Sequence, residues 1–573
     1  MHFALVVILS QGAAWGEEAK SPPRAAAAPS SAADGLRELL DFSYAGLDRR
    51  LGPAYDHYHR GTKEAFPTVY LAPRKQDKGG RPYQIGGPWN KGNAGDYSST
   101  QGQVLYGGPR GFGVDRVTII EWAHGCWTES PEPPWWGGFR PEPAAKAWNA
   151  RGTPLAMARG MGGWSNLGLI VFSSGLVATA GTATAAGNNA TFRFPPDKIP
   201  TAISVTNRNE FALVTIYDSR RQQGQVAVLA LVGSGKASGF AHEWPDDYPC
   251  LPNVAIITGI KLLGYVELPD LKYPSSISAV GNRMGGRVNG ADGHAGLLRN
   301  FNLDDAAARR SFATGSNAAY CSNAGFAIVA SKSEGQVALL DLEPLFAYVR
   351  QMYFDSQESY QQTRNLGAAA DQWPYTFAHE PKWQPTVVKT LAIERPTAVL
   401  ASLSGGDKAL AYAASEKGEL HVLGVGGLAT PGAAIADDVT RLHTLAIGAN
   451  PTCLAYQKGS RDTLIAVCRG DREIQWIKAS RQEAQIIRRL RDARLIDPVY
   501  VEMADTHGIE AGLITVADFG GRKILNYRWT AVKFATQGGA VYGMGPQGKD
   551  EFECGGILEF PGSPFCISAT NVN

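Results

Sequence analysis

The chain has 573 residues, of which 44% are hydrophobic, and it carries 55 basic and 53 acidic side chains. A net charge of +2 provides no overall field that would direct the protein to nucleic acid or to an anionic membrane, and we expect neither as a partner. The 66 glycines, the 34 prolines and an aromatic content of 10% favour many short strands and tight turns over helices.

The first residues form a short apolar run followed by small residues, which is typical of a secretory signal peptide. We therefore predict that residues 1–19 direct export to the periplasm or the extracellular space. No Lys or Arg precedes the apolar run, so a buried N-terminal strand is the alternative. Residues 20–34, rich in Ala, Ser and Pro, are predicted to be a linker. No apolar run reaches the roughly eighteen residues of a membrane span, and no transmembrane segment is expected.

Residues 35–163 are predicted to be an irregular N-terminal extension, rich in Trp, Gly and Pro, that packs on the rest of the protein. Within it, strands are predicted near residues 102–106 and 115–122. Trp135 and Trp136 are adjacent in a stretch with many other tryptophans. These rings are interpreted as anchors for the extension, or alternatively as a surface that contacts sugar or polyproline ligands.

From residue 164 onward one pattern recurs, in which an apolar run leads through a proline-containing corner into a second apolar run. Each proline comes just before a strand, where its missing N–H costs no ladder hydrogen bond. The corners occupy residues 191–205, 264–280, 389–401, 443–455, 488–501 and 556–568.

Most corners are followed by two further apolar runs separated by a polar turn, which gives four strands per repeat. Pro396, Pro451 and Pro498 lie 55 and 47 residues apart, a spacing typical of propeller blades. We predict an all-β fold in which residues 164–573 form a six-bladed β-propeller, with seven blades as the alternative. The C-terminal strand is predicted to close the ring by pairing with residues 167–172, because closure removes exposed sheet edges.

Two stretches carry a resemblance to a known class of repeats. The run GQVALLDL that begins at Gly335 and the run LPDLKYPSSI that begins at Leu268 resemble the YVTN-type and lactonase-like β-propeller repeats of exported bacterial proteins. The resemblance implies the propeller architecture and export. It implies no catalytic residue in this chain, because no Tyr-Val-Thr-Asn tetrapeptide, Trp-Asp ending or propeller-enzyme motif is present.

The seven cysteines are spread singly, without a Cys-x-x-Cys motif. Cys453 and Cys468 fall on strands one and two of the same predicted blade, either side of a turn near Ser460. An antiparallel hairpin folded there places them nearly opposite each other. We predict two unbonded buried thiols rather than a strained disulfide.

Long insertions are predicted to emerge at one end of the ring, which we call the long-loop face, and the other end, with short turns, is the short-turn face. The insertions span about 231–260, 281–323, 343–384 and 531–555. Because loops carry function more often than scaffolds do, candidate binding residues are sought there.

Two insertions share the phrase Phe-Ala-His-Glu, which contains His242-Glu243 and His379-Glu380. These pairs could hold a metal or act as general acid and base, or they could be structural corners kept from an internal duplication. Arg283 and Arg287, in a glycine-rich loop, complete the candidate binding residues of this face. The sequence specifies no metal and no cofactor.

Two functions remain open at this point. The first is a non-catalytic exported scaffold or binding subunit that engages other protein subunits through its long-loop face and N-terminal extension. The alternative is a propeller enzyme, a hydrolase or a metal-dependent oxidoreductase, with its site at the long-loop face. A propeller fold alone does not decide between them.

Overall fold

The computed structural model describes most of the chain from residue 100 onward. The described ranges are 100–107, 117–122, 154–159, 167–181, 191–206, 210–234, 256–283, 303–318, 321–365, 367–403, 409–457, 462–503, 513–528, 532–535, 541–544, 552–559 and 563–572. The predictions for residues 1–19 and 20–34 lie outside these ranges. So do five of the candidate site residues: Trp135, Trp136, His242, Glu243 and Arg287.

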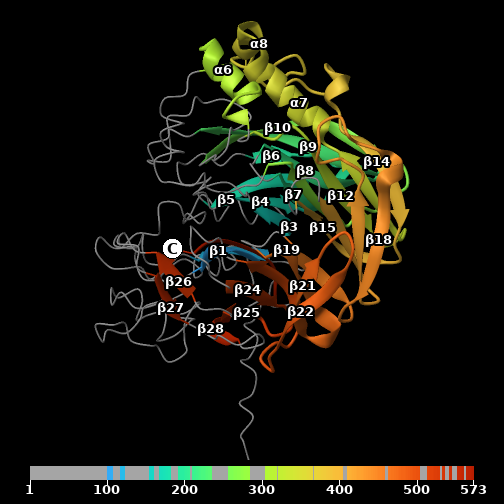
Figure 1. Cartoon of the computed structure of the whole chain (residues 1–573), viewed down its shortest axis with the longest axis vertical. Coiled ribbons are helices and arrows are strands. Elements are labelled where there is room, and N and C mark those ends of the chain that lie inside the picture. The colour runs from blue at the N-terminus through green and yellow to red at the C-terminus, as the bar shows by residue number, and fades with distance from the viewer. Residues whose placement is uncertain are drawn as a thin grey trace, which may run out of the picture.

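Six four-stranded antiparallel sheets are arranged as the blades of a β-propeller, which confirms the predicted fold class (Figure 1). The first three contain β3 (Pro154–Arg159), β4 (Leu167–Phe172), β5 (Leu176–Gly181) and β6 (Thr191–Arg193); β7 (Lys198–Val205), β8 (Phe211–Asp218), β9 (Gln223–Ser234) and β10 (Ile256–Leu268); and β11 (Ser276–Gly281), β12 (Gly325–Ser331), β13 (Gln336–Asp341) and β14 (Thr386–Ala392). The other three contain β15 (Pro396–Ser402), β16 (Leu410–Ser415), β17 (Glu419–Val425) and β18 (Val439–Ala446); β19 (Pro451–Tyr456), β20 (Thr463–Cys468), β21 (Glu473–Ala479) and β22 (Ala484–Arg491); and β23 (Pro498–Met503), β24 (Leu513–Asp518), β25 (Lys523–Arg528) and β28 (Glu553–Glu559).

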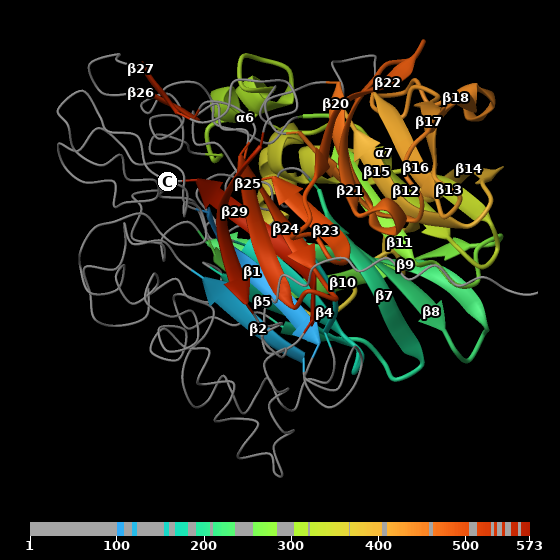
Figure 2. The same ribbon diagram turned by 90° about the horizontal axis from the view of Figure 1, so that it is seen from below.

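The C-terminal strand closes the ring, but with a partner other than the predicted one. Strand β29 (Ser563–Val572) pairs with β1 (Thr100–Gly107), which pairs with β2 (Val117–Trp122), in a three-stranded sheet (Figure 2). The predicted partner, β4, is instead paired with β3. The prediction was wrong because β3 already occupies the edge of β4 that β29 would need.

Seven inner strands therefore surround the propeller axis. They contact one another in the order β29, β3, β7, β11, β15, β19, β23 and back to β29. Six belong to the four-stranded sheets and the seventh is β29. Strands β1, β2 and β3, which come from the segment predicted as an irregular extension, are thus part of the propeller sheets. A small hairpin of β26 (Val532–Ala535) and β27 (Val541–Met544) lies within the insertion between β25 and β28.

A proline marks the start of each inner strand and shapes its contact with the next blade. In β3, β7, β15, β19 and β23 the register shifts directly after this proline, as in a β-bulge. In three of these strands the bulge residue is a threonine whose hydroxyl donates to a carbonyl at or just before the start of the next inner strand, from Thr201 to Pro274 at 2.6 Å, from Thr397 to Pro451, and from Thr452 to Val499 at 2.8 Å. A backbone carbonyl on the unpaired inner edge of one blade thereby receives a hydrogen bond from the neighbouring blade.

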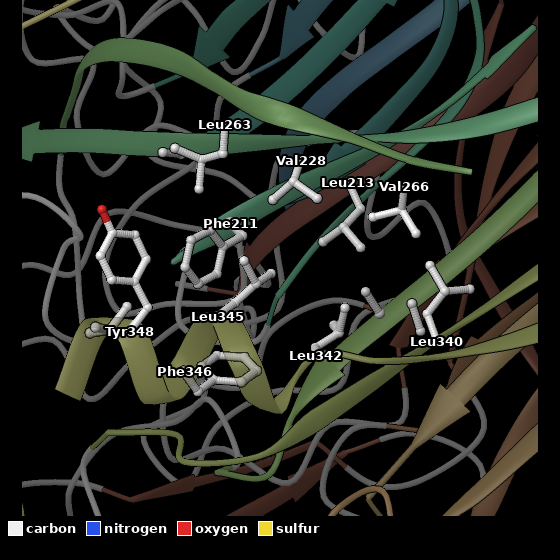
Figure 3. Close-up of a cluster of buried hydrophobic side chains, with 14 of the residues drawn as sticks. Phe211, Leu213, Val228, Leu263, Val266, Leu340, Leu342, Leu345, Phe346 and Tyr348 are labelled. Atoms are coloured by element: carbon white, nitrogen blue, oxygen red, sulfur yellow. The ribbon is translucent and has the colours of Figure 1, made fainter. Parts of the chain in front are cut away.

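The hydrophobic core is divided into clusters between adjacent blades, because each sheet presents both faces to its neighbours. The largest cluster joins the blade of β7–β10 to that of β11–β14 and continues into helices (Figure 3). Phe211, Phe346 and Tyr348 are nearly fully buried there. The helices are thus part of the folded core and not loose additions to it.

The bulge in β19 also corrects the predicted cysteine register. Cys453 pairs with Val467, whereas Cys468 pairs with Pro451. The two thiols lie in different clusters on opposite faces of the sheet. Both are free and buried, which confirms the predicted unbonded state.

Candidate functional site

The long-loop face carries a folded helical region, which we call the helical module and define as residues 303–318, 342–365 and 367–385. Its elements are α6 (Ala306–Ala313), α7 (Glu343–Arg350), η6 (Gln351–Asp355), α8 (Gln357–Gln362) and η7 (Pro381–Trp383). They come from two insertions of one blade, between β11 and β12 and between β13 and β14. Both insertions leave the blade at the same end, and their helices lie together beyond β10 (Figure 1).

Local sequence explains where these helices begin. The side chain of Asp305 accepts a hydrogen bond from the backbone N–H of Ala307, and the Ser356 hydroxyl accepts one from Ser359, each at 3.0 Å. Such N-caps satisfy donors that a helix start leaves free and contribute about 1 kcal/mol each. Helix α7 then turns its apolar side chains into the core, where Leu345 is fully buried.

A cluster of aromatic rings forms the interior of the helical module. Tyr348 makes an edge-to-face contact with Trp373 at 4.8 Å between ring centroids and stacks on Trp383 at 5.1 Å. The Trp373 ring also meets Tyr353 at 5.7 Å. Each such pair contributes about 0.5–1.5 kcal/mol beyond its area burial, so the aromatic interior gives the module a defined shape.

Basic side chains fasten the module by donating to backbone carbonyls. Arg309 donates from Nη1 to the carbonyls of Leu303 at 2.6 Å and Asp304 at 3.1 Å, and also to the Gln357 side chain, which links α6 to α8. Arg350 donates from Nη2 to Phe312 at 3.2 Å. These contacts hold the two insertions together as one unit.

Lys261 fastens the module to a different blade. From β10 its Nζ donates to the carbonyls of Ala369 at 2.8 Å and Gln372 at 2.7 Å. Burial lowers the pKa of Lys261 to about 8, with nearby Asp371 opposing that shift. The module is thus anchored to two neighbouring blades.

Three of the predicted candidate residues lie at this face. His379 is exposed, with its ring centroid 5.3 Å from that of Tyr375. Glu380 forms an ion pair with Lys382 at 3.6 Å, and its backbone N–H donates to Thr376. Arg283 lies just after the end of β11. In the described ranges, no three or more His, Cys, Asp and Glu side chains gather closely enough to hold a metal ion.

A cavity of about 270 Å³ lies among the inner strands, on the propeller axis. Its polar lining comes mainly from residues two and four positions after the corner prolines. Hydroxyl groups come from Ser204, Ser276 and Ser278, and a phenol and a carboxylate come from Tyr500 and Glu502. The corners are recognisable in the sequence, but the polar lining was not predicted from them. Polar residues two and four positions after a corner proline are the signal that identifies it.

Two thiols in this cavity serve as joints between blades. Cys453 Sγ donates to the carbonyl of Val501 at 3.6 Å, and Cys566 Sγ donates to that of Met157 at 3.7 Å. Burial is the main cause that raises the pKa of each thiol to about 12. Because the thiolate is the nucleophilic form, both cysteines are held in an inert, hydrogen-bonding state at neutral pH.

Together these features define the chain as a β-propeller with a folded helical module on one face. None of the helices in the described ranges is both long and apolar enough to cross a membrane. No protein-family model matches the chain, and no curated protein matches it.

Several solved structures are similar to this chain at low identity. The periplasmic gluconolactonase PpgL of Pseudomonas aeruginosa is 12% identical and covers 83% of this chain and 100% of its own, with a TM-score of 0.40. A functionally unknown protein of Desulfotomaculum acetoxidans is 9% identical over the same shares, with a TM-score of 0.40. A putative 6-phosphogluconolactonase of Bacteroides fragilis is 8% identical over 82% of this chain and 98% of its own, with a TM-score of 0.39. We draw no functional conclusion from these matches.

Proposed function

We propose that the protein is a non-catalytic, exported β-propeller that binds another protein subunit through its helical module. The observation that supports this most directly is that two separate insertions form one anchored unit on one face. Binding residues are held most effectively by rigid supporting structure. Lys261, Arg309 and Arg350 supply that support.

The outer surface of the module suits a partner that associates and dissociates. Its exposed side chains are largely polar and of both charges, and they include Asp305, Asp355, Gln361, Gln362 and Lys382. A non-obligate interface resembles ordinary protein surface in its apolar content and relies on hydrogen bonds at a polar rim. The buried rings of the module shape this surface without contributing an exposed apolar patch.

Charge reversal tests the module directly. The double variant Asp355→Lys with Lys382→Glu reverses two exposed charges and leaves the net charge unchanged. Cross-linked partners captured from the source cells and quantified by mass spectrometry should fall at least several-fold with this variant, because rim charges govern association.

The N-terminal residues 1–19 are proposed to direct export, which cell fractionation with and without them would test.

The matched control lies on the opposite face. Asp270→Lys with Lys272→Glu makes the same pair of substitutions at exposed positions in the corner between β10 and β11, on the short-turn face. This variant should retain the partners at the wild-type level. Equal retention by both double variants, or the absence of any specifically cross-linked protein, would show that the module is not the binding surface.

A further inference from the structure

The axial cavity has two chemically different walls that face each other. Counting around the ring of inner strands, β7 and β11 each lie three positions from β23. In a ring of seven, this places them directly across the axis from β23. The serines of β7 and β11 therefore lie opposite Tyr500 and Glu502 of β23.

These side chains also match in height along the axis. Ser204, Ser278 and Glu502 each lie four residues after the corner proline of their strand, and Ser276 and Tyr500 each lie two residues after theirs. Equivalent positions on equivalent inner strands lie at the same level. A carboxylate and two hydroxyls thus share one level, and a phenol and a third hydroxyl share the next.

The serine hydroxyls are already oriented by the backbone. Ser204 Oγ accepts a hydrogen bond from the N–H of Ala279, and Ser278 Oγ accepts one from that of Ala401, each at 3.0 Å. With one lone pair engaged in this way, each hydroxyl retains a proton and a second lone pair. The wall is therefore able both to donate to a ligand and to accept from it.

The electrostatic character of the cavity favours positive charge. Among the described lining residues, Glu502 is the carboxylate and none of the others is basic. Its negative charge contributes to raising the pKa of Tyr500 on the same strand, of Cys453 on β19 and of Cys566 on β29, so its field reaches both neighbouring inner strands. The small residues Ala156, Ala202 and Ala398 also line the cavity.

We propose that the axial cavity binds a small amino alcohol, with its ammonium group at Glu502 and its hydroxyl group among Ser204, Ser276 and Ser278. The carboxylate accepts charge-assisted hydrogen bonds from the ammonium, and these are the strongest contacts available in the site. The serine hydroxyls exchange hydrogen bonds with the hydroxyl group at the other end of the ligand. This site is separate from the proposed protein-binding surface on the helical module.

The test uses ethanolamine as the probe, with ethylene glycol and glycolate as neutral and anionic probes of similar size. Saturation-transfer NMR and calorimetry on the full chain should show that ethanolamine binds and the other two do not. Glu502→Gln keeps the shape of the side chain and should raise the Kd by about tenfold or more, which corresponds to about 1.4 kcal/mol. Ser276→Ala with Ser278→Ala should raise it by several-fold, because two neutral hydrogen-bonding groups are removed.

Glu358→Gln is the matched control, because this residue is exposed on α8, away from the cavity. It should leave the Kd unchanged, and thermal melting should show that all variants fold. If Glu502→Gln does not fold, the serine double variant still distinguishes a cavity site from surface binding. Equal binding of ethylene glycol, no binding of ethanolamine at about 20 mM, or an unchanged Kd in the serine variant would each overturn the proposal.

Discussion

The hydroxyl of Thr452 donates a hydrogen bond to the carbonyl of Val499 at 2.8 Å, and this bond joins two blades of the propeller. The same joint is made by Thr201 and by Thr397, each also a bulge residue directly after a corner proline. Three of the blade-to-blade contacts are therefore encoded in a two-residue Pro-Thr step. Substitutions at this step should affect the ring and leave the separate sheets intact.

Replacement of Thr452 by Val tests this joint. The substitution preserves shape but removes the donor, so the carbonyl of Val499 loses its partner. We expect the free energy of unfolding to fall by about 1–2 kcal/mol. Chemical denaturation measures this change, and Thr440→Val, at an exposed position of β18, is the control. Equal effects of the two substitutions would contradict the role of the joint.

The contact of Lys261 with the helical module predicts a pH dependence. Its pKa in the folded protein is lowered to about 8 from the ordinary value of 10.5. Between these pH values the unfolded chain binds more protons, so this residue makes the free energy of unfolding rise with pH. Because Lys261 is only half-buried, solvent screening limits this rise in the free energy of unfolding to about 1–2 kcal/mol.

The measurement compares variants between pH 7.5 and pH 10. Lys261→Met should remove the rise in the free energy of unfolding with pH that Lys261 contributes. Lys272→Met, at an exposed site, should keep that rise. The difference between the two variants isolates Lys261 from the other lysines. Identical pH profiles for both variants would show that the ammonium of Lys261 is not desolvated by the module.

Deletion of residues 565–573 should open the ring. It removes most of β29, which lies between β23 and β3 and pairs with β1. The loss leaves strand edges unpaired, and such edges associate with other chains. Size-exclusion chromatography should show aggregation, whereas Cys566→Ser, which keeps the strand, should remain as the wild type. A truncated protein that melts like the full chain would refute closure by β29.

The two thiols that line the axial cavity should resist alkylation in the native protein. Cys453 and Cys566 are buried and have pKa values raised to about 12, so the reactive thiolate is scarce at pH 8. Iodoacetamide labelling followed by peptide mass spectrometry should detect modification at these residues only after denaturation. Cys453→Ser should keep the hydrogen bond to Val501, and Cys453→Ala should cost about 1 kcal/mol more than the serine variant. Rapid native labelling would contradict the burial of the thiols.

The propeller itself could be predicted because its signals are local. A corner proline, the strand after it and the next turn lie within a few residues, and a strand's burial pattern is visible in its own sequence. This holds for the corners at Pro396, Pro451 and Pro498. It also holds for Pro154, whose corner was overlooked because it falls within the Trp-rich segment.

The long-range features were decided by tertiary structure. Cys566 pairs with Leu105 across more than 400 positions of sequence, and either end of the chain offered other apolar runs that could have filled the same edge. The bulge after Pro451 moved Cys468 away from Cys453, because one extra residue reverses the face to which a side chain points.

The two candidate sites show the same division between local and long-range information. The lengths and positions of the insertions were evident from the sequence, and so His379 and Glu380 were placed on the long-loop face. The anchoring of the module by Lys261 and the alignment of Glu502 with the serines across the axis were not. Such alignments depend on how many inner strands complete the ring and on the register of each, which are set by the packing of all the blades together.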